Sequence, residues 1–414
     1  MTQAFVRAAP APQLPPPETA GGRMAALSRN LFGSPKSLAL TLGAAVLAIW
    51  AVPDLLRYFV FGAVWHGNAA TCRATDGACW PFIAEKLPYF IYGSYPLDQR
   101  WRVDLVFAIG ALLTAWLLMP RAPDHDDFGS NRSKIMNVID SKYLERDLRE
   151  KPVSTFSHPA LRRRLGVWLA FLVYPILAFV LLYGWPVLGL PRVASDLWGG
   201  MLVTLIVSAF GIVVSLPLGI LLALGRRSGP PAVRLVSIAF IEFMRGVPMI
   251  AVLFMANTML PLFLPEGAEP DRLVRPLVGV ALFASAYMAE VVRGGLQAMA
   301  RGQSEAGAAL GLRFFAIQRL VVLPQVLRLV IPAIANTFIG LFKDTTLVAT
   351  VGIFDFLRTV DSARLDPNWS GPTITPTAYA FAALVYFVCC FGLSRYAQGL
   401  ERRLAAGYGR DRFQ

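Results

Sequence analysis

The sequence predicts an all-α membrane protein of about eight transmembrane helices, because apolar residues dominate the chain and gather in blocks. Hydrophobic residues make up 56% of the 414 residues and charged residues only 16%, and the mean hydropathy is +0.53. A soluble domain carries about a quarter charged residues. The blocks are roughly 18–28 residues long, close to the ~20 residues that a helix needs to cross a bilayer core.

The N-terminal part is expected to hold a tail and two spans. Residues 1–36 are rich in proline and alanine with scattered arginines. This composition is typical of a disordered cytoplasmic tail, and it lacks the apolar core of a signal peptide. Residues 37–120 are expected to contain spans at 37–60 and 103–119, joined by a periplasmic loop at 61–102. The loop is rich in Trp, Tyr and Pro, as are segments at a membrane surface.

Two of the four cysteines, Cys72 and Cys79, lie in this loop. Disulfides persist outside the cytoplasm, and a spacer of six residues can close into a bridge. A disulfide and a pair of free thiols therefore both stay open. The other two, Cys389 and Cys390, lie in the last apolar block, where we expect them to face lipid or another helix.

The remaining blocks follow a charged segment at 121–164, which ends in an arginine triplet and is expected to be a cytoplasmic loop. The third span is expected within 165–190. Residues 399–414 are expected to form a cytoplasmic tail. The five blocks between lie at 197–224, 233–264, 274–299, 326–353 and 378–393. The block at 233–264 is interrupted by Arg245-Gly246-Val247-Pro248.

The placement of arginine predicts the orientation of the chain. Arginines gather beside alternate ends of the blocks, so the positive-inside rule places both termini in the cytoplasm. The net charge of +13 reflects this pattern. The sequence has no Lys/Arg run interleaved with aromatics, so the positive charge does not indicate nucleic-acid binding. The arginines expected on the cytoplasmic side are Arg226, Arg227, Arg301, Arg313, Arg319, Arg402 and Arg403.

The loop after the sixth block has a specific pattern. Its residues are Glu305-Ala306-Gly307, three residues, Gly311, nine residues, then Val321-Val322-Leu323-Pro324. This pattern resembles the loop by which permeases of ABC importers dock on their ATPase subunits, which is Glu-Ala-Ala, three residues, Gly, nine residues, Ile-x-Leu-Pro. Gly307 and Val321 depart from it conservatively. The resemblance implies that this loop couples the spans to an ATPase.

The same residues predict two short helices. Ser304 can cap a helix that starts at Glu305, whose carboxylate suits the positive end of the helix dipole. Gly311 can adopt the left-handed conformation that ends this helix. Residues 312–323 are expected to form a second helix, and Pro324 to start the next span.

Two Glu-x-x-Arg-Gly motifs lie in adjacent spans. Glu242 and Arg245 are three residues apart on one helix, as are Glu290 and Arg293, so each pair can partly neutralise itself. The repeat predicts two similar bends near the cytoplasmic mouth. The pairs can be structural ion pairs at an inner gate or contacts in the translocation path, and both interpretations stay open.

A third polar cluster in a span is Lys343-Asp344-Thr345. Charged groups inside a span cost about 3 kcal/mol or more each unless they are paired or face a cavity. An ammonium and a carboxylate could pair with the charged groups of an amino acid. We therefore expect these residues to line the translocation path.

Further stretches resemble the polar-amino-acid branch of the ABC-importer permeases. They lie at 198–205, 240–248, 286–295 and 341–347. The resemblance covers 197–398 and implies a type I ABC importer permease core of five spans, with its cytoplasmic coupling loop at 300–324. The N-terminal extension resembles that of the larger permease subunit of broad-specificity L-amino-acid importers.

The resemblance implies a function and partners. The chain would be the permease subunit of an ATP-driven importer in the bacterial inner membrane, for polar L-amino acids of the glutamate, glutamine, aspartate and asparagine type. Its implied partners are an ATP-binding subunit dimer, a second permease subunit in a heterodimer, a periplasmic amino-acid-binding protein and membrane lipid.

The sequence contains no Gly-x-x-x-x-Gly-Lys-Ser/Thr phosphate loop. We expect no enzymatic activity and no cofactor in this chain, with ATP and Mg²⁺ bound by the separate ATPase. Its three histidines are isolated and show no metal-ligand spacing, so no metal site is expected.

Two other interpretations stay open. A secondary transporter of small polar solutes, driven by an ion gradient, would show inverted halves and acidic residues deep in its spans. A membrane enzyme using Glu290 or Asp344 as its catalytic carboxylate would need several polar groups at one depth. An ATPase that co-purifies with the chain would favour the importer.

Overall fold

The structure, a computed structural model, describes residues 23–118, 173–265, 267 and 270–406. Every regular element in these ranges is a helix, apart from three isolated β-bridges. The chain divides into two compact units. Unit 1 comprises Met1–Ala84 and Pro367–Thr377, and unit 2 comprises Glu85–Asp366 and Ala378–Gln414. The predicted charged loop at 121–164 lies outside the described residues.

The first span in unit 1 is a long, mostly exposed helix. Helix α2 (Pro35–Leu56) continues as a π-helical turn to Phe61, and this helix covers the span predicted at 37–60. Ser34 and Ser37 form a capping box at its start, which satisfies free backbone N–H groups. No residue of α2 is buried within the chain. Its apolar surface is therefore available all round to lipid or to another protein.

The prediction that 1–36 is a disordered tail is wrong for its last third. Helix α1 (Arg23–Phe32) forms there, while residues 1–22 lie outside the described residues. Its sequence RMAALSRNLF consists mostly of good helix formers. Leu27 and Leu31 are one turn apart and give the helix an apolar side. This local periodicity favours a helix here, although the overall composition of residues 1–36 is typical of a disordered segment.

The rest of unit 1 is a disulfide-linked loop. Helix α3 (Ala69–Arg73) is followed by Cys79, which forms a disulfide with Cys72 across a Cα–Cα distance of 5.6 Å. Arg73 donates hydrogen bonds to the carbonyl oxygens of Asn368 and Ser370, at 2.7 and 3.0 Å. The Cys79 N–H donates to Thr377 Oγ1 at 3.0 Å. These contacts tie the loop to residues 367–377.

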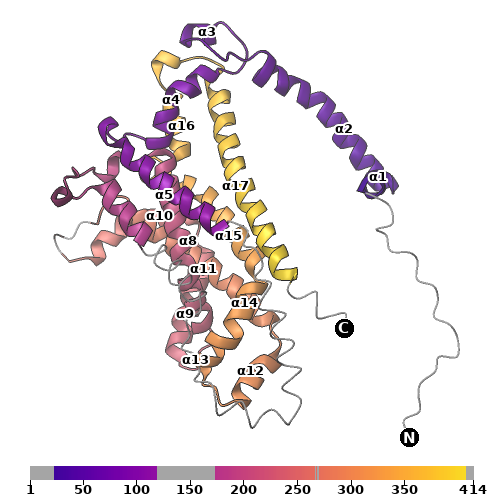
Figure 1. Ribbon diagram of the computed structural model, residues 1–414, viewed down its shortest axis with the longest axis vertical. Helices are drawn as coiled ribbons and strands as arrows, with labels where there is room; N and C mark the ends of the chain where they lie inside the picture. Colours follow the sequence, from indigo (N-terminus) through magenta and orange to yellow (C-terminus); the bar gives the residue numbers. More distant parts are fainter. Residues whose placement is uncertain (1–22, 119–172, 266, 268–269, 407–414) are drawn as a thin grey trace, which may run out of the picture. The chain divides into compact units, whose positions relative to one another are not determined.

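The centre of unit 2 is a pair of closely packed helices, α8 (Gly200–Gly225) and α11 (Val274–Ala298) (Figure 1). A Cβ at Gly219 would lie 2.7 Å from the Met288 side chain, so only glycine permits this approach of the two backbones. Buried apolar residues from several helices surround the pair. They include Val103, Val203, Leu253, Val280 and Val348.

The fifth predicted span is sharply broken. Helix α9 (Pro231–Gly246) and helix α10 (Met249–Met259) meet at 112°. Val247 has φ −104° and ψ 136°, the extended conformation that a following proline favours. Pro248 therefore ends α9, at the interruption that the sequence predicts.

The second bend predicted from the repeated Glu-x-x-Arg-Gly motif does not form. Helix α11 runs without interruption through Glu290, Arg293 and Gly294. No proline follows this motif, so no backbone N–H is lost and the helix continues. The bend in α9–α10 is thus a property of Val247-Pro248 and not of the charged motif.

The seventh span starts differently from its prediction. The helical segment Phe314–Leu329 runs through Pro324 and meets Ile331–Val351 at 63°, so the bend lies at Val330. A π-helical turn, η7 (Gln318–Val322), precedes Pro324. This wider turn lets the helix continue past a residue that has no backbone N–H to donate. The break falls instead before Pro332, at the second position of helix α15 (Ile331–Asp344).

Eight apolar helical segments correspond to the eight predicted spans. Four described helices are long and apolar enough to cross a membrane, or six when each bent pair counts as one span. The other two segments are α5 (Arg100–Leu118) and the apolar helix Val173–Tyr183, whose predicted span begins outside the described residues. The 399–414 tail is shorter than predicted, because α17 (Ile374–Ala406) continues into it.

Candidate functional site

The predicted coupling loop contains a short exposed helix, α12 (Arg301–Ala309). It begins four residues earlier than the Glu305 start expected from the sequence, and its N-cap is Ala300, not Ser304. Ala300 is extended, with φ −63° and ψ 130°, so the chain is ready to begin a helix directly after it. Ser304 and Glu305 therefore lie within the helix, on its exposed side.

Gly311 ends α12 in the left-handed conformation that the sequence predicts, with φ +76°. The N–H of Leu312 donates to the Gly307 carbonyl at 3.2 Å, and the N–H of Gly311 donates to the Ala308 carbonyl at 2.9 Å. This pair of bonds is a Schellman motif, which satisfies carbonyl groups at the helix end. The turn directs the chain into helix α13 (Phe314–Ile317).

The segment after α12 is anchored in a buried cluster. Ile317, Val322 and Val326 are 8%, 4% and 0% exposed. They pack with apolar residues of the other helices at this end of unit 2, namely Ala223 of α8, Ile241 of α9, and Ala289, Val292 and Leu296 of α11. A displacement of this segment therefore acts directly on three other helices.

The apolar tip, formed by the turn after α12 together with α13 and η7 (Gln318–Val322), is exposed. Leu310, Phe315 and Leu320 are 80%, 82% and 64% exposed. The tip lies at one end of unit 2, and helix α16 (Phe356–Ala363) lies at the other end (Figure 1). A soluble surface rarely exposes large apolar groups together unless a partner covers them.

The other residues of the predicted coupling pattern are distributed along this segment. Ala306 is exposed on α12, whereas Gly307 is buried against Ile317. Val321 is half-buried in η7. Leu323 and Pro324 begin helix α14 (Leu323–Leu329), with Leu323 half-buried and Pro324 exposed.

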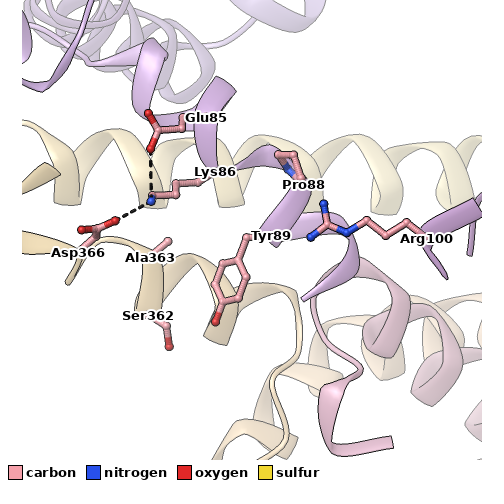
Figure 2. Close-up of a pocket in the computed structure, with 8 residues that line it drawn as sticks. All are labelled: Glu85, Lys86, Pro88, Tyr89, Arg100, Ser362, Ala363 and Asp366. Carbon is pink, nitrogen blue, oxygen red and sulfur yellow. Dashed lines mark hydrogen bonds and ion pairs between the residues drawn. The ribbon is translucent and has the colours of Figure 1, made fainter. Parts of the chain in front are cut away.

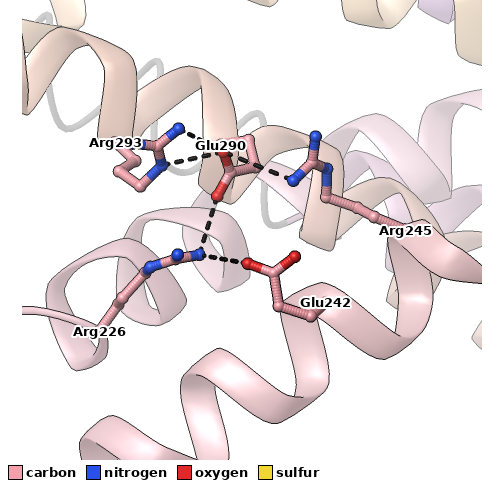
Figure 3. Close-up of polar contacts among 5 residues, drawn as sticks. All are labelled: Arg226, Glu242, Arg245, Glu290 and Arg293. Atoms are coloured by element: carbon pink, nitrogen blue, oxygen red, sulfur yellow. Dashed lines mark hydrogen bonds and ion pairs between the residues drawn. The ribbon is translucent and has the colours of Figure 1, made fainter.

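The charged residues of the two Glu-x-x-Arg motifs meet in one ion-pair cluster (Figure 3). Glu290 of α11 lies at its centre and is 15% exposed. Its carboxylate is 2.7 Å from Arg293, 3.1 Å from Arg226 and 3.6 Å from Arg245. The Arg226 guanidinium also lies 2.9 Å from Glu242.

The sequence predicts only one of these pairs. Glu290 and Arg293 pair at three residues' separation, as expected. Glu242 instead pairs with Arg226, and Arg245 reaches across to Glu290. Arg226, at the end of α8, was predicted only as a cytoplasmic-side charge. The only available signal for it was the Arg226-Arg227 doublet at the end of an apolar block.

The cluster joins three helices, and the cluster itself carries a surplus of positive charge. Three guanidinium groups surround two carboxylates, and they come from α8, α9 and α11. The neighbouring Arg227 donates to the Leu296 carbonyl at 3.3 Å, and Leu296 belongs to the buried cluster that anchors the segment after α12. The ion pairs and the segment that follows α12 therefore contact the same ends of α8, α9 and α11. This segment is called the coupling segment below.

Lys343, Asp344 and Thr345 lie where α15 passes into the 3₁₀ segment η8 (Thr345–Val351). Lys343 is exposed, Asp344 is half-buried, and Thr345 is fully buried with its hydroxyl donating to the Phe342 carbonyl at 2.8 Å. The ion pairs formed by the described residues do not include Lys343 or Asp344.

The described part of the chain contains no group of three or more His, Cys, Asp or Glu residues that could hold a metal ion. Its free thiols are Cys389 and Cys390, both half-buried on α17.

The sequence matches a known family and close relatives. Residues 215–406 match the model of the binding-protein-dependent transport system inner membrane component. The chain is 42% identical over 399 residues to the inner membrane amino-acid ABC transporter permease protein YhdY of Escherichia coli (strain K12), covering 96% of this chain and 97% of the relative.

Two further relatives differ in how much of the chain they cover. The glutamate/glutamine/aspartate/asparagine transport system permease protein BztC of Rhodobacter capsulatus is 39% identical, over 97% of this chain and 98% of the relative. The glutamate/aspartate import permease protein GltK of Escherichia coli O157:H7 is 32% identical, over 50% of this chain and 92% of the relative. The similarity to the first two relatives thus spans nearly the whole chain, and the similarity to the third spans half of it.

These matches define an integral membrane permease built from apolar helices. The chain belongs to the family of amino-acid ABC transporter permeases, the inner membrane components of binding-protein-dependent transport systems. Permeases of this family are not enzymes, and they work with ATP-binding subunits and substrate-binding proteins. Membership favours this class over the ion-gradient-driven transporter and the membrane enzyme.

Proposed function

We propose that the chain forms the translocation path for polar L-amino acids of the glutamate, glutamine, aspartate and asparagine type, together with a second, different permease subunit. The support for this substrate class is the full-length similarity to the Rhodobacter capsulatus permease, whose name gives these four amino acids. A heterodimer is proposed because the N-terminal extension resembles that of the larger of two permease subunits.

Helix α12 and its apolar tip form the contact with the ATPase. This proposal depends on one observation: α12 is exposed at its surface, while the segment that follows it is buried among α8, α9 and α11. A partner can therefore hold the tip, and its movement reaches the spans through Ile317, Val322 and Val326. ATP and Mg²⁺ are bound by that partner.

The ion-pair cluster around Glu290 acts as the inner gate. Its groups lie at the ends of α8, α9 and α11 that contact the coupling segment. When ATP binding moves α12, the three helix ends shift and the ion pairs exchange partners. Lys343 and Asp344 line the path beyond the gate, whereas Thr345 is buried beside them.

Both termini lie in the cytoplasm, and a periplasmic binding protein delivers the cargo at the opposite face. The arginine pattern supports this orientation. The Cys72–Cys79 disulfide supports it independently, because such bonds persist in the periplasm and not in the cytoplasm.

The experiment reverses a charge on α12. The importer is reconstituted in liposomes with its ATPase, partner permease and binding protein, and uptake of labelled L-glutamine is measured. Glu305→Arg should lower ATP-driven uptake by about tenfold or more, the effect of a coupling loss of about 1.4 kcal/mol. It should also reduce the ATPase retained during purification.

The matched control is Glu401→Arg, the same reversal on an exposed residue of α17. It should leave uptake unchanged. Normal uptake by the Glu305 variant would overturn the coupling role. Failure of unlabelled glutamate, aspartate and asparagine to compete with glutamine would overturn the substrate class.

A further inference from the structure

Helix α1 (Arg23–Phe32) is a short helix whose apolar side is exposed. Leu27 and Leu31 are 55% and 36% exposed, and Phe32, its last residue, is 57% exposed. The helix has 10 residues, and isolated helices shorter than about 12–15 residues are marginal in water. Contacts outside α1 are therefore needed to keep it helical.

A hydrogen bond to α2 fixes where the end of α1 lies. The Thr41 hydroxyl donates to the Leu31 carbonyl at 2.9 Å. Thr41 lies nearly two turns into α2, about 9 Å along the helix axis from Pro35. The chain therefore turns back at Gly33-Ser34, and the C-terminal end of α1 lies beside the first turns of α2 instead of extending it.

The start of α2 lies at a membrane surface. The apolar span Pro35–Phe61 is 27 residues long, enough to cross the bilayer core, so its first residues lie where the bilayer meets water. Figure 1 shows α1 at this end of α2 and helix α3 of the disulfide-linked loop at the other end. Helix α1 is thus held at the boundary between lipid and water.

The segment around α1 is positively charged. Residues 23–36 contain three basic residues and no Asp or Glu, so their net charge is +3. The basic residues are Arg23, Arg29 and Lys36. At about 100° per residue, position 29 lies about 160° around the helix axis from both Leu27 and Leu31. Apolar positions on one face and a basic position opposite are typical of helices that lie in the interface plane of an anionic membrane.

We propose that α1 binds the membrane surface beside the start of α2, and that its basic residues select anionic phospholipid headgroups. Leu27, Leu31 and Phe32 enter the upper part of the acyl chains. Because the Thr41–Leu31 bond joins the two helices, a bound α1 fixes the depth and the tilt at which the first span enters the bilayer. This inference does not depend on the proposed cargo or on the ATPase contact.

Another protein subunit could also cover the apolar side of α1, but position and size favour lipid. Helix α1 follows the membrane surface because it is folded against the start of a span. It has only 10 residues, whereas a stable protein interface uses about 20–30 residues on each side. A protein contact at α1 is therefore treated as an outcome of the test.

The test compares hydrogen exchange of the α1 amides in the full chain, placed in two kinds of nanodisc. One contains phosphatidylcholine only, and the other contains equal amounts of phosphatidylcholine and phosphatidylglycerol. Exchange should be about tenfold or more slower with phosphatidylglycerol, because the bound helix opens less often. High salt should shrink the difference, since it screens the headgroup charge. Equal exchange in the two nanodiscs at low salt would overturn the proposal.

Two variants test the two faces of α1. Arg29→Gln should speed exchange of the α1 amides with phosphatidylglycerol by about fivefold, the effect of one basic residue near an anionic surface. Leu27→Gln should speed it in both nanodiscs, because it places an amide among the acyl chains. Arg402→Gln, at an exposed arginine of α17, is the matched control and should leave α1 unchanged. Wild-type exchange in the Arg29 variant would show that charge does not hold the helix.

A comparison of the chain alone with the complete importer separates lipid from protein. Both are placed in the nanodisc with phosphatidylglycerol, and the proposal expects the same slow exchange of α1 in both. If α1 is protected only in the complete importer, a protein subunit covers it and the proposal is wrong.

Discussion

Arg226 and Glu290 lie 64 positions apart in the sequence, yet their side chains are 3.1 Å apart in the structure. The contact joins the end of α8 to the C-terminal half of α11. Arg226 also bonds Glu242 of α9, so one guanidinium links three helices. Its two partners differ in burial, since Glu290 is 15% exposed and Glu242 is 54% exposed.

This difference predicts unequal costs for removing the two carboxylates. Glu290→Gln leaves three arginines without their shared partner and should lower the free energy of unfolding by about 2 kcal/mol, less than the 3–5 kcal/mol for a fully buried pair. Glu242→Gln should cost about 0–1 kcal/mol, because an exposed pair contributes little. Thermal unfolding of both variants in nanodiscs would measure the difference. Equal shifts in Tm would show that Glu290 is not the centre of the cluster.

The two glycines of α12, Gly302 and Gly307, predict different responses to alanine. Gly302 has no neighbouring atom within 4 Å of an added Cβ, so Gly302→Ala should stabilise α12 by about 0.5 kcal/mol. At Gly307 the Cβ would lie 3.1 Å from Ile317 Cγ1. Crowding should therefore offset the gain in helix propensity. Hydrogen exchange of the α12 amides would compare the variants, and equal protection would mean that Ile317 moves away freely.

Asp355 predicts a stability that depends on pH. It is 0% exposed and caps α16 by accepting from the N–H groups of Leu357 and Arg358, at 3.0 and 3.1 Å. Burial raises the pKa of its carboxyl from 3.8 to about 6. Because the folded pKa is above the unfolded one, the favourable contribution is present at low pH and is lost as pH rises from about 4 to about 6.

Asp355→Asn should remove this loss and keep the cap, since Asn caps helices as well as Asp does. Its advantage in stability over wild type should grow by about 2 kcal/mol between pH 4.5 and pH 7.5. Asp361→Asn is the control of opposite sign. A hydrogen bond from Tyr379 and the neighbouring Arg364 lower the pKa of Asp361. Its variant should lose stability at neutral pH and recover relative to wild type in acid. A constant difference for Asp355→Asn across this range would contradict the prediction.

The Cys72–Cys79 disulfide predicts that the stability of its loop depends on redox conditions. Replacing Cys72 and Cys79 by serine removes a crosslink over seven positions, which should destabilise the 62–84 loop by about 2–3 kcal/mol. Limited proteolysis should cut the loop faster in the variant than in wild type, and dithiothreitol should accelerate cutting in wild type only. Serine at the free thiols Cys389 and Cys390 is the control and should not change the cutting rate. Identical cutting of oxidised and reduced wild type would contradict the prediction.

Much of the fold could be predicted from local patterns. Apolar block length located the spans, Val247-Pro248 located the break between α9 and α10, and Gly311 marked the end of α12. Each of these depends on a few consecutive residues. The early start of α12 was missed because its N-cap, Ala300, has no capping side chain and therefore no sequence signal.

The non-local part of the site could not be predicted in this way. Glu242 and Arg245 share a helix, but their partners Arg226 and Glu290 come from two other helices. Lys86 likewise pairs with Asp366, which lies 280 positions further along the chain (Figure 2). Such contacts depend on the packing of whole helices, which periodicity and spacing do not specify.

The 112° break between α9 and α10 has a mechanical consequence. Pro248 has no N–H, so no backbone hydrogen bond from residue 248 ties the last turn of α9 to the first turn of α10. A rotation of α9 therefore produces little torque on α10, and the two halves of this span can tilt about separate axes. The two ends of this span can therefore change their tilt independently of each other.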